Sequence, residues 1–144
     1  MYCSGKVIAN IENESQILIQ FQIGSAHSHG RLIQPPSRAS AWRYGFNTPA
    51  DYNDNEGFCG GFDYQFNVAD GNCGICGDPW FADPREHEAP NGKYATGTIT
   101  AAYDQGQTID VQIDITANHR GLFEFRLCPN TSIDSDPEQG CFDK

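Results

Sequence analysis

The stretch Thr108–Thr116 reads TIDVQIDIT, with Ile or Val at every second position and Asp or Gln between them. This period of two is the signature of a β-strand with one buried face. Residues 122–128 (LFEFRLC) repeat the alternation, and residues 94–103 (YATGTITAAY) are rich in β-prone Thr, Ile and Tyr. Three such segments joined by short polar turns predict an antiparallel sheet. The fold class is therefore all-β, with a β-sandwich as the expected architecture.

The rest of the chain limits its size and its partners. The 144 residues fit one domain, and residues 29–93 are rich in Gly, Pro, Asn, Asp and Cys, which predicts loops and short elements pinned by disulfides. The net charge of −10 would repel nucleic acid and anionic membranes, so we expect neither as a partner. A neutral partner, such as a polysaccharide or another protein, suits this surface better.

Residues 1–28 are interpreted as a leader, an atypical signal peptide. Residues 17–23 (ILIQFQI) form its apolar core, although two glutamines interrupt that core. Ala26 and Ser28 are small residues at the third and first positions before a cut that would follow Ser28. Such a cut would make His29 the N-terminal residue of a secreted, extracellular protein. The six cysteines are typical of the same oxidising compartment.

Two of the four histidines are candidate metal ligands. The N-terminal amine and the ring of a processed His29 would offer two nitrogens in one chelate. The ring of His119, which follows the predicted strand 108–116, would add a third, and three such nitrogens suit Cu(II). Without processing at His29, a solvent-exposed turn is the simpler role for His119. His87 begins a stretch similar to the HExxH motif of zinc proteases, but Asn91 stands in the second histidine position, so that motif fails.

The cysteines leave several readings open. The run Cys73-Gly74-Ile75-Cys76 is a CxxC motif, compatible with a zinc site, a redox pair or structural disulfides. No second CxxC and no βαβ pattern supports the first two, so structural disulfides are preferred, and six cysteines allow 15 pairings. Loss of Cys3 with the leader would leave an odd number, so we expect a missing partner, with Cys141 one candidate. The disulfide candidates are Cys59, Cys73, Cys76, Cys128 and Cys141.

Longer motifs carry a family resemblance. They are residues 29–33 (HGRLI), 35–46 (PPSRASAWRYGF), 58–61 (FCGG), 73–78 (CGICGD), 92–97 (GKYATG), 116–119 (TANH) and 123–130 (FEFRLCPN). Together they resemble lytic polysaccharide monooxygenases of auxiliary activity family 15, which are also described as chitin-binding type-4 domains. The resemblance covers residues 29–144, which would form the N-terminal part of such a copper monooxygenase domain.

The resemblance implies an immunoglobulin- or fibronectin III-like β-sandwich with long disulfide-pinned loops, incomplete in this chain. His29 and His119 would bind Cu(II) as a histidine brace and so be the catalytic residues, with Ala117 beside the metal. The implied reaction is oxidative cleavage of crystalline β-1,4-linked polysaccharide, chitin first and cellulose second. It would use O2 or H2O2 and an external reductant, and we expect a monomer.

Two other functions remain open. A non-catalytic polysaccharide-binding module of the same fold would keep the sandwich and bind no copper. In either function Trp42 and Tyr44 could stack on sugar rings, although aromatic side chains more often serve packing. A disulfide-rich secreted structural protein would bind no ligand at all. Processing at His29 separates the monooxygenase from the binding module.

The family resemblance also implies residues beyond the end of this chain, with further strands, further cysteines and an axial Tyr or Phe beside the copper. We therefore expect a protein made only of residues 29–144 to be unstable and weakly active, because an incomplete sheet exposes its edges and its apolar face. Thermal unfolding and an assay for oxidised oligosaccharides test this. A cooperative transition together with full activity would contradict it.

Overall fold

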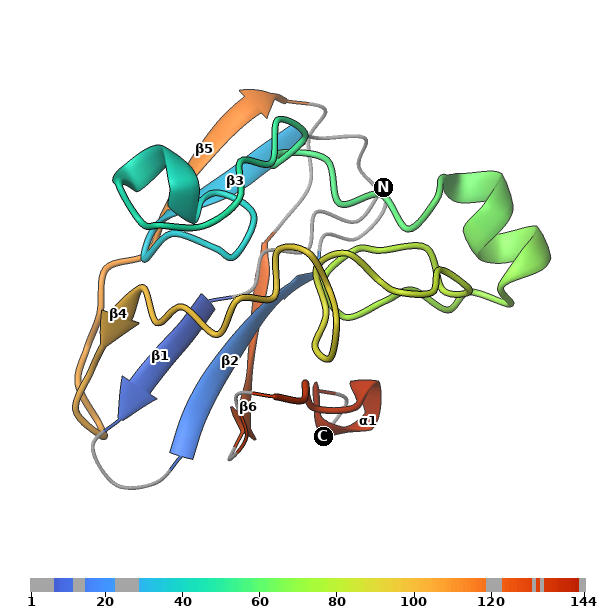
Figure 1. Ribbon diagram of the computed structural model, residues 1–144. Helices are drawn as coiled ribbons and strands as arrows, with labels where there is room; N and C mark the ends of the chain where they lie inside the picture. Colours follow the sequence, from blue (N-terminus) through green and yellow to red (C-terminus); the bar gives the residue numbers. More distant parts are fainter. Residues whose placement is uncertain are drawn as a thin grey trace.

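The computed structural model describes residues 7–11, 15–22, 29–118, 123–130, 132 and 134–142 (Figure 1). In these residues the chain is built from strands, long loops and a few helical turns. The strands are β1 (Val7–Ile11), β2 (Ser15–Gln22), β3 (His29–Gln34), β4 (Ala101–Ala102), β5 (Gln112–Ala117) and β6 (Glu124–Asn130). The helical turns are the 3-10 helix η1 (Ala41–Tyr44), the π-helix η2 (Tyr64–Val68) and the α-helix α1 (Gln139–Phe142).

The described strands form two sheets. One has the order β4-β1-β2-β6, and the other pairs β3 with β5. Strands β1 and β2 pair antiparallel, β6 runs antiparallel to β2, and β4 adds to β1 in parallel. The loop segment that carries η2, green in Figure 1, projects away from both sheets. Within the described ranges, no helix has the length and apolar character needed to cross a membrane.

Strands β1 and β2 lie within residues 1–28, the predicted leader. The leader interpretation concerns cleavage after Ser28, and it remains a prediction.

The predicted pairing of successive strands is wrong. Strands β4, β5 and β6 do not pair with one another, because each finds its partner in an earlier part of the chain. Of residues 94–103, only Ala101–Ala102 form a strand, and β5 begins at Gln112, four positions after Thr108. Alternation in sequence shows which face of a strand can be buried, but it does not identify the neighbouring strand.

Much of the apolar face of residues 108–116 packs against other apolar side chains, as the alternation predicts. Buried Leu32 on β3 packs against the partly buried Ile109, Val111 and Ile113, and Phe123 joins them. These contacts explain why β5 pairs with β3, since the pairing brings both apolar faces together. The burial ends before the strand does, and Ile115 is 48% exposed.

The buried face of strand β6 is the opposite of the predicted one. The alternation in residues 122–128 predicts that Phe125 and Leu127 are buried, yet they are 45% and 56% exposed. The opposite face is the covered one, because Cys128 forms a disulfide with Cys141 beside α1. On the same face Arg126 donates a hydrogen bond of 2.9 Å to the backbone oxygen of Phe142. The covalent link to α1 thus decides which side of β6 is covered.

Two disulfides are present in the described chain, Cys59–Cys73 and Cys128–Cys141. The expectation that Cys141 lacks its partner is therefore wrong. Cys76 belongs to neither bridge and lies buried with Ile75, Cys128 and Phe142 in a small core. Such a small apolar cluster contributes little to the free energy of unfolding by itself. Disulfides and ion pairs therefore contribute a larger share of the stability.

One ionic link is the buried pair of Arg38 and Asp136. The two side chains are 8% and 6% exposed, and two hydrogen bonds of 2.9 and 3.2 Å join them. Asp136 also accepts the backbone N–H of Ala89 at 2.7 Å, and Arg38 donates to the backbone oxygen of His87. This pair therefore connects the segment after β3, the loop at residues 87–89 and the chain just before α1.

Replacing Asp136 by Ala should lower the free energy of unfolding by about 3–5 kcal/mol, because it leaves the buried Arg38 charge uncompensated. Urea unfolding of the full chain measures the change. Asp134→Ala is the matched control, since Asp134 is an exposed carboxylate two residues away. Equal stability of the two variants would show that the ion pair does not hold these segments.

Candidate metal centre

His29 is the first residue of β3, and its register partner across the sheet is Ala117, the last residue of β5. The structure thus brings together the predicted metal ligand and the residue predicted to lie beside the metal. The His29 side chain is 28% exposed. His119, the other predicted ligand, lies outside the described residues.

The pairing of β3 with β5 is irregular at this end. His29 faces Ala117 but Gly30 faces Ile115, so Thr116 is an extra residue on β5. A bulge of this kind re-aims the residue beside it. A Cβ atom at Gly30 would lie 3.2 Å from the backbone oxygen of Asp114, so glycine permits the close approach of the two strands.

A short loop segment, residues 54–56, lies along the start of β3 and contacts it residue by residue. The contacts run in opposite chain directions, as between antiparallel strands. They are Glu56 Oε1 to His29 Nε2 at 3.4 Å, Asn55 O to Gly30 N at 3.1 Å, and Asp54 Oδ1 to Arg31 Nη1 at 2.7 Å. We call residues 54–56 the β3 clasp.

Two residues of the β3 clasp, Asp54 and Asn55, also contact other elements. The Asp54 carboxylate is fully buried and also accepts hydrogen bonds from Arg43, which lies on η1. The side-chain amide of Asn55 donates to Thr116 Oγ1 at 2.8 Å, at the bulge of β5. The clasp therefore links the start of β3 to β5 and to η1.

His87, set aside in the sequence because the zinc-protease motif fails, is the centre of a second polar network. Its Nδ1 is 2.8 Å from Asp78 Oδ1, its Nε2 is 2.9 Å from Asp51 Oδ2, and its ring stacks on Tyr94. Burial opposes the charged ring, yet the hydrogen bonds and charges of the two aspartates raise the pKa of His87 to about 9. Only the histidine itself was visible as a signal in the sequence, because its partners are 36 and 9 residues away.

Glu56 and His87 line one cavity of about 190 Å³. Five carboxylate residues border it, namely Asp51, Asp54, Glu56, Asp78 and Glu86. Three of these carboxylates are already engaged, with His87 or with arginines. In the described residues, no group of three or more His, Cys, Asp and Glu side chains is arranged to hold a metal ion. The zinc reading of the CxxC motif is not supported there, since Cys59, Cys73 and Cys128 form disulfides.

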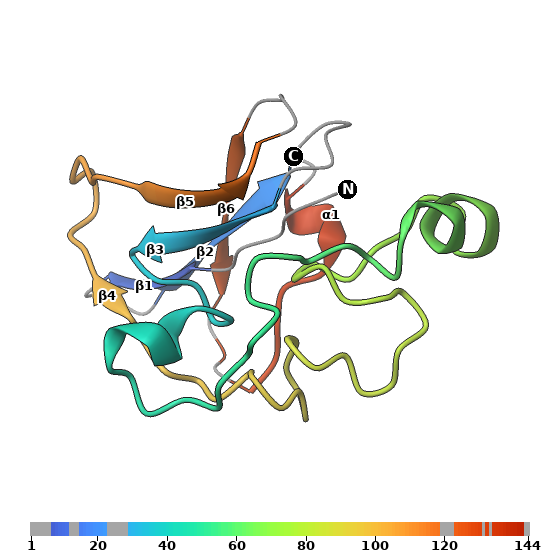
Figure 2. The ribbon, with the colours of Figure 1, turned by 90° about the horizontal axis from the view of Figure 1, so that it is seen from above.

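The two candidate sugar-stacking residues lie on η1. Trp42 is partly buried, donates its indole N–H to the backbone oxygen of Asp51 at 3.0 Å, and packs edge-on against Tyr52. Tyr44 is 46% exposed. Figure 2 shows η1 near the C-terminal end of β3, away from the end where His29 begins the strand. The structure therefore does not bring these aromatic residues next to His29.

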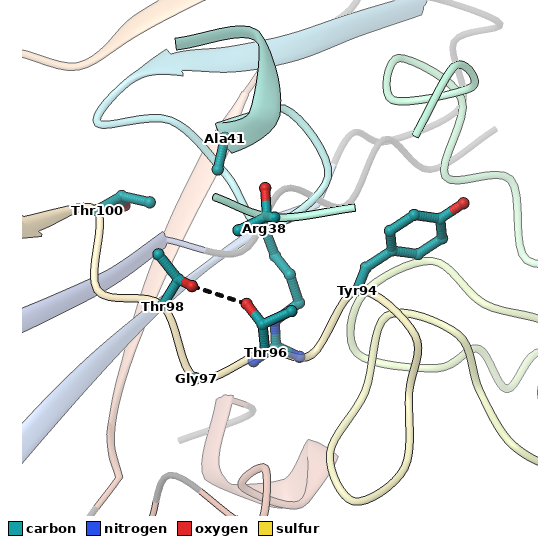
Figure 3. Close-up of a pocket in the computed structure, with 8 residues that line it drawn as sticks. Arg38, Ala41, Tyr94, Thr96, Gly97, Thr98 and Thr100 are labelled. Carbon is teal, nitrogen blue, oxygen red and sulfur yellow. Dashed lines mark hydrogen bonds between the residues drawn. The ribbon is translucent and has the colours of Figure 1, made fainter. Parts of the chain in front are cut away.

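A further pocket lies beside Arg38 and Tyr94 (Figure 3). Threonine side chains make up much of its wall, and Thr96 and Thr98 are joined by a hydrogen bond of 2.8 Å. Its volume of about 10 Å³ is close to that of one water molecule. It is far too small for a sugar unit, so it is not a candidate substrate site.

Comparison with protein families matches residues 29–144 to the model described as "Lytic polysaccharide mono-oxygenase, cellulose-degrading". The chain belongs to the lytic polysaccharide monooxygenase family. The match begins at His29, the residue that starts β3. Comparison with curated proteins gave no match.

Among solved structures, this monooxygenase-family chain is similar to a lytic polysaccharide monooxygenase AA15 from Thermobia domestica, determined in the Cu(I) state. The sequence identity is 46% and the TM-score is 0.74, over 80% of this chain and 59% of the other. The predicted resemblance to auxiliary activity family 15 is confirmed. The chain has the fold of these monooxygenases over the matched part, and it spans 59% of the length of that structure.

The pKa of His87 gives a pH-dependent stability. It rises from 6.5 to about 9 on folding, so the protonated ring stabilises the fold fully below about pH 6.5. That contribution, of about 3 kcal/mol at most, should be lost as the pH rises towards about 9. Urea unfolding over this range measures it. The His87→Gln variant should lack this pH dependence, and parallel curves for both proteins would contradict the assignment.

Proposed function

We propose that this chain, after cleavage behind Ser28, binds one copper ion and cleaves β-1,4-linked polysaccharide by oxidation. The observation that carries the proposal is the pairing of His29 with Ala117 at the end of the β3–β5 sheet. Only Asn118 separates Ala117 from His119 in the sequence, so the chain can span at most ~7 Å between residues 117 and 119. The family match, which begins at His29, supports the same start of the mature protein.

The donor set fits copper. A processed His29 offers an amine and an imidazole, His119 offers a second imidazole, and nitrogen-rich sites of this kind favour Cu(II). Ala117, whose side chain is a single methyl group, lies opposite His29 and takes up little space at this end of the β3–β5 sheet. When bound, copper supplies the redox chemistry that activates O2 or H2O2 with electrons from an external reductant. The relative from Thermobia domestica, determined in the Cu(I) state, supports the choice of metal.

The protein's own contribution is to hold His29 firmly. The bulge at Thr116, the close approach permitted by Gly30 and the β3 clasp fix the start of β3 from several sides. A metal centre works best when its ligands are fixed before the metal binds, because less ordering is then required.

We propose crystalline chitin or cellulose as the substrate. The matching family is described as cellulose-degrading, and the resemblance to auxiliary activity family 15 favours chitin. The complete domain would be an immunoglobulin- or fibronectin III-like sandwich, secreted and monomeric. The two disulfides fit an extracellular protein.

A non-catalytic polysaccharide-binding module is the second candidate. The family match and the shared fold are compatible with it. Such a module would keep the fold and bind the polysaccharide without copper chemistry. Copper uptake separates the two candidates.

The decisive measurement is intact mass and N-terminal sequencing of the protein secreted from cells that express the full chain, with and without Cu(II). We expect an N-terminus at His29, a mass gain of one copper, and oxidised oligosaccharides from chitin or cellulose when a reductant is added. His119→Ala should abolish the copper gain while leaving the N-terminus unchanged, which controls for adventitious metal. A retained leader or no copper uptake would favour the binding module.

A further inference from the structure

An imidazole ring can present either of its two nitrogens to a metal, and the proton then sits on the other. For an N-terminal histidine, only Nδ1 is close enough to the backbone to close a small chelate ring with its own α-amine. Nε2, at the far side of the ring, must then carry the proton. A group that accepts that proton in a hydrogen bond fixes both the tautomer and the direction of the ring.

Glu56 is placed to do this for His29. Its Oε1 atom lies 3.4 Å from His29 Nε2, within the range of an ion pair and slightly longer than an ordinary N–H···O hydrogen bond. The two side chains are 28% and 32% exposed, so both are partly shielded from water. The carboxylate stands on the Nε2 side of the ring, so it is placed to act through His29 and not as a competing ligand beside Nδ1.

The backbone that carries Glu56 is fixed on both sides. The backbone N–H of Glu56 donates to Asn53 O at 3.2 Å, which closes a turn, and Asn55 O accepts the N–H of Gly30. The Asp54 carboxylate, fully buried, binds Arg31 and Arg43. Because residue 54 is anchored to β3 itself, any movement of the strand start moves Glu56 with it. The distance from Glu56 to His29 is therefore a property of the fold.

We propose that Glu56 is a positioning residue of the metal centre, whose carboxylate accepts the Nε2–H of His29 and directs Nδ1 and the N-terminal amine towards the metal. Only the part of this inference that concerns copper binding rests on the proposed function. Its structural part, the fixed tautomer and ring direction of His29, applies to the metal-free full chain. Asn55 and Asp54 act as supports, because they hold the backbone of Glu56 against β3.

The test compares Glu56→Leu, which cannot accept a hydrogen bond, with Glu56→Gln, which keeps an acceptor oxygen. In the metal-free full chain, long-range proton–nitrogen correlation spectra report which His29 nitrogen carries the proton. We expect one tautomer in the unchanged protein, with the proton on Nε2. Glu56→Leu should give a mixture of tautomers and a mobile ring, and Glu56→Gln should restore much of the original spectrum.

Copper affinity gives the second readout, on protein secreted from cells that express each full-length variant. Loss of a partner behind a ligand histidine weakens metal binding by about 10- to 100-fold, so we expect Glu56→Leu to bind Cu(II) at least about tenfold more weakly. Glu86→Leu is the matched control, because Glu86 borders the same cavity and is exposed. It should leave the tautomer and the affinity unchanged.

The outcomes separate this inference from the proposed function. Copper binding by the unchanged protein, with equal affinity in Glu56→Leu and an unchanged His29 spectrum, would overturn the role of Glu56 while leaving the copper site intact. Failure of the unchanged protein to bind copper would count against the proposed function alone. The metal-free spectra would then still decide whether Glu56 fixes His29, and a proton on Nδ1 in the unchanged chain would overturn it.

Discussion

The buried Asp54 carboxylate is the constraint on which the functional end of the molecule depends. A carboxylate with no exposed surface must be compensated, and Arg31 from β3 and Arg43 from η1 provide that compensation. Meeting this requirement places residue 54 against β3, and the next two residues then lie opposite Gly30 and His29. The position of the predicted metal ligand thus follows from the burial of one negative charge.

The same principle organises the long loops between β3 and β4. The clusters of buried apolar residues are small, around Leu32 and around Ile75 and Phe142. Polar networks provide further contacts that hold these loops in place. Arg38 binds Asp136, and the His87 ring lies between two aspartates. Networks of this kind require that each member is satisfied, because a single missing partner leaves a buried charge or donor uncompensated. The loops are therefore specified by charge pairs more than by hydrophobic packing.

The sequence predicted strand-forming segments, disulfides and the family, because alternation, cysteine content and contiguous motifs are local signals. It did not predict which strands pair, because the alternation in residues 108–116 does not show that β3 is the neighbouring strand. It also missed which face of β6 is covered, because that depends on the link from Cys128 to Cys141. His29 and Ala117 could be named from their motifs, whereas Glu56 could not, since only the folded loop brings it to the imidazole.

The β3 clasp contacts its strand one residue against one residue, over residues 54–56 and 29–31. A one-residue shift of this segment along β3 would change all three contacts at once: Asn55 would take the place of a carboxylate, and one carboxylate would face Gly30. Loop length is consequently under as tight a constraint as loop composition. Most surface loops tolerate inserted residues, but this loop must keep its length, because its contacts with β3 are matched residue by residue.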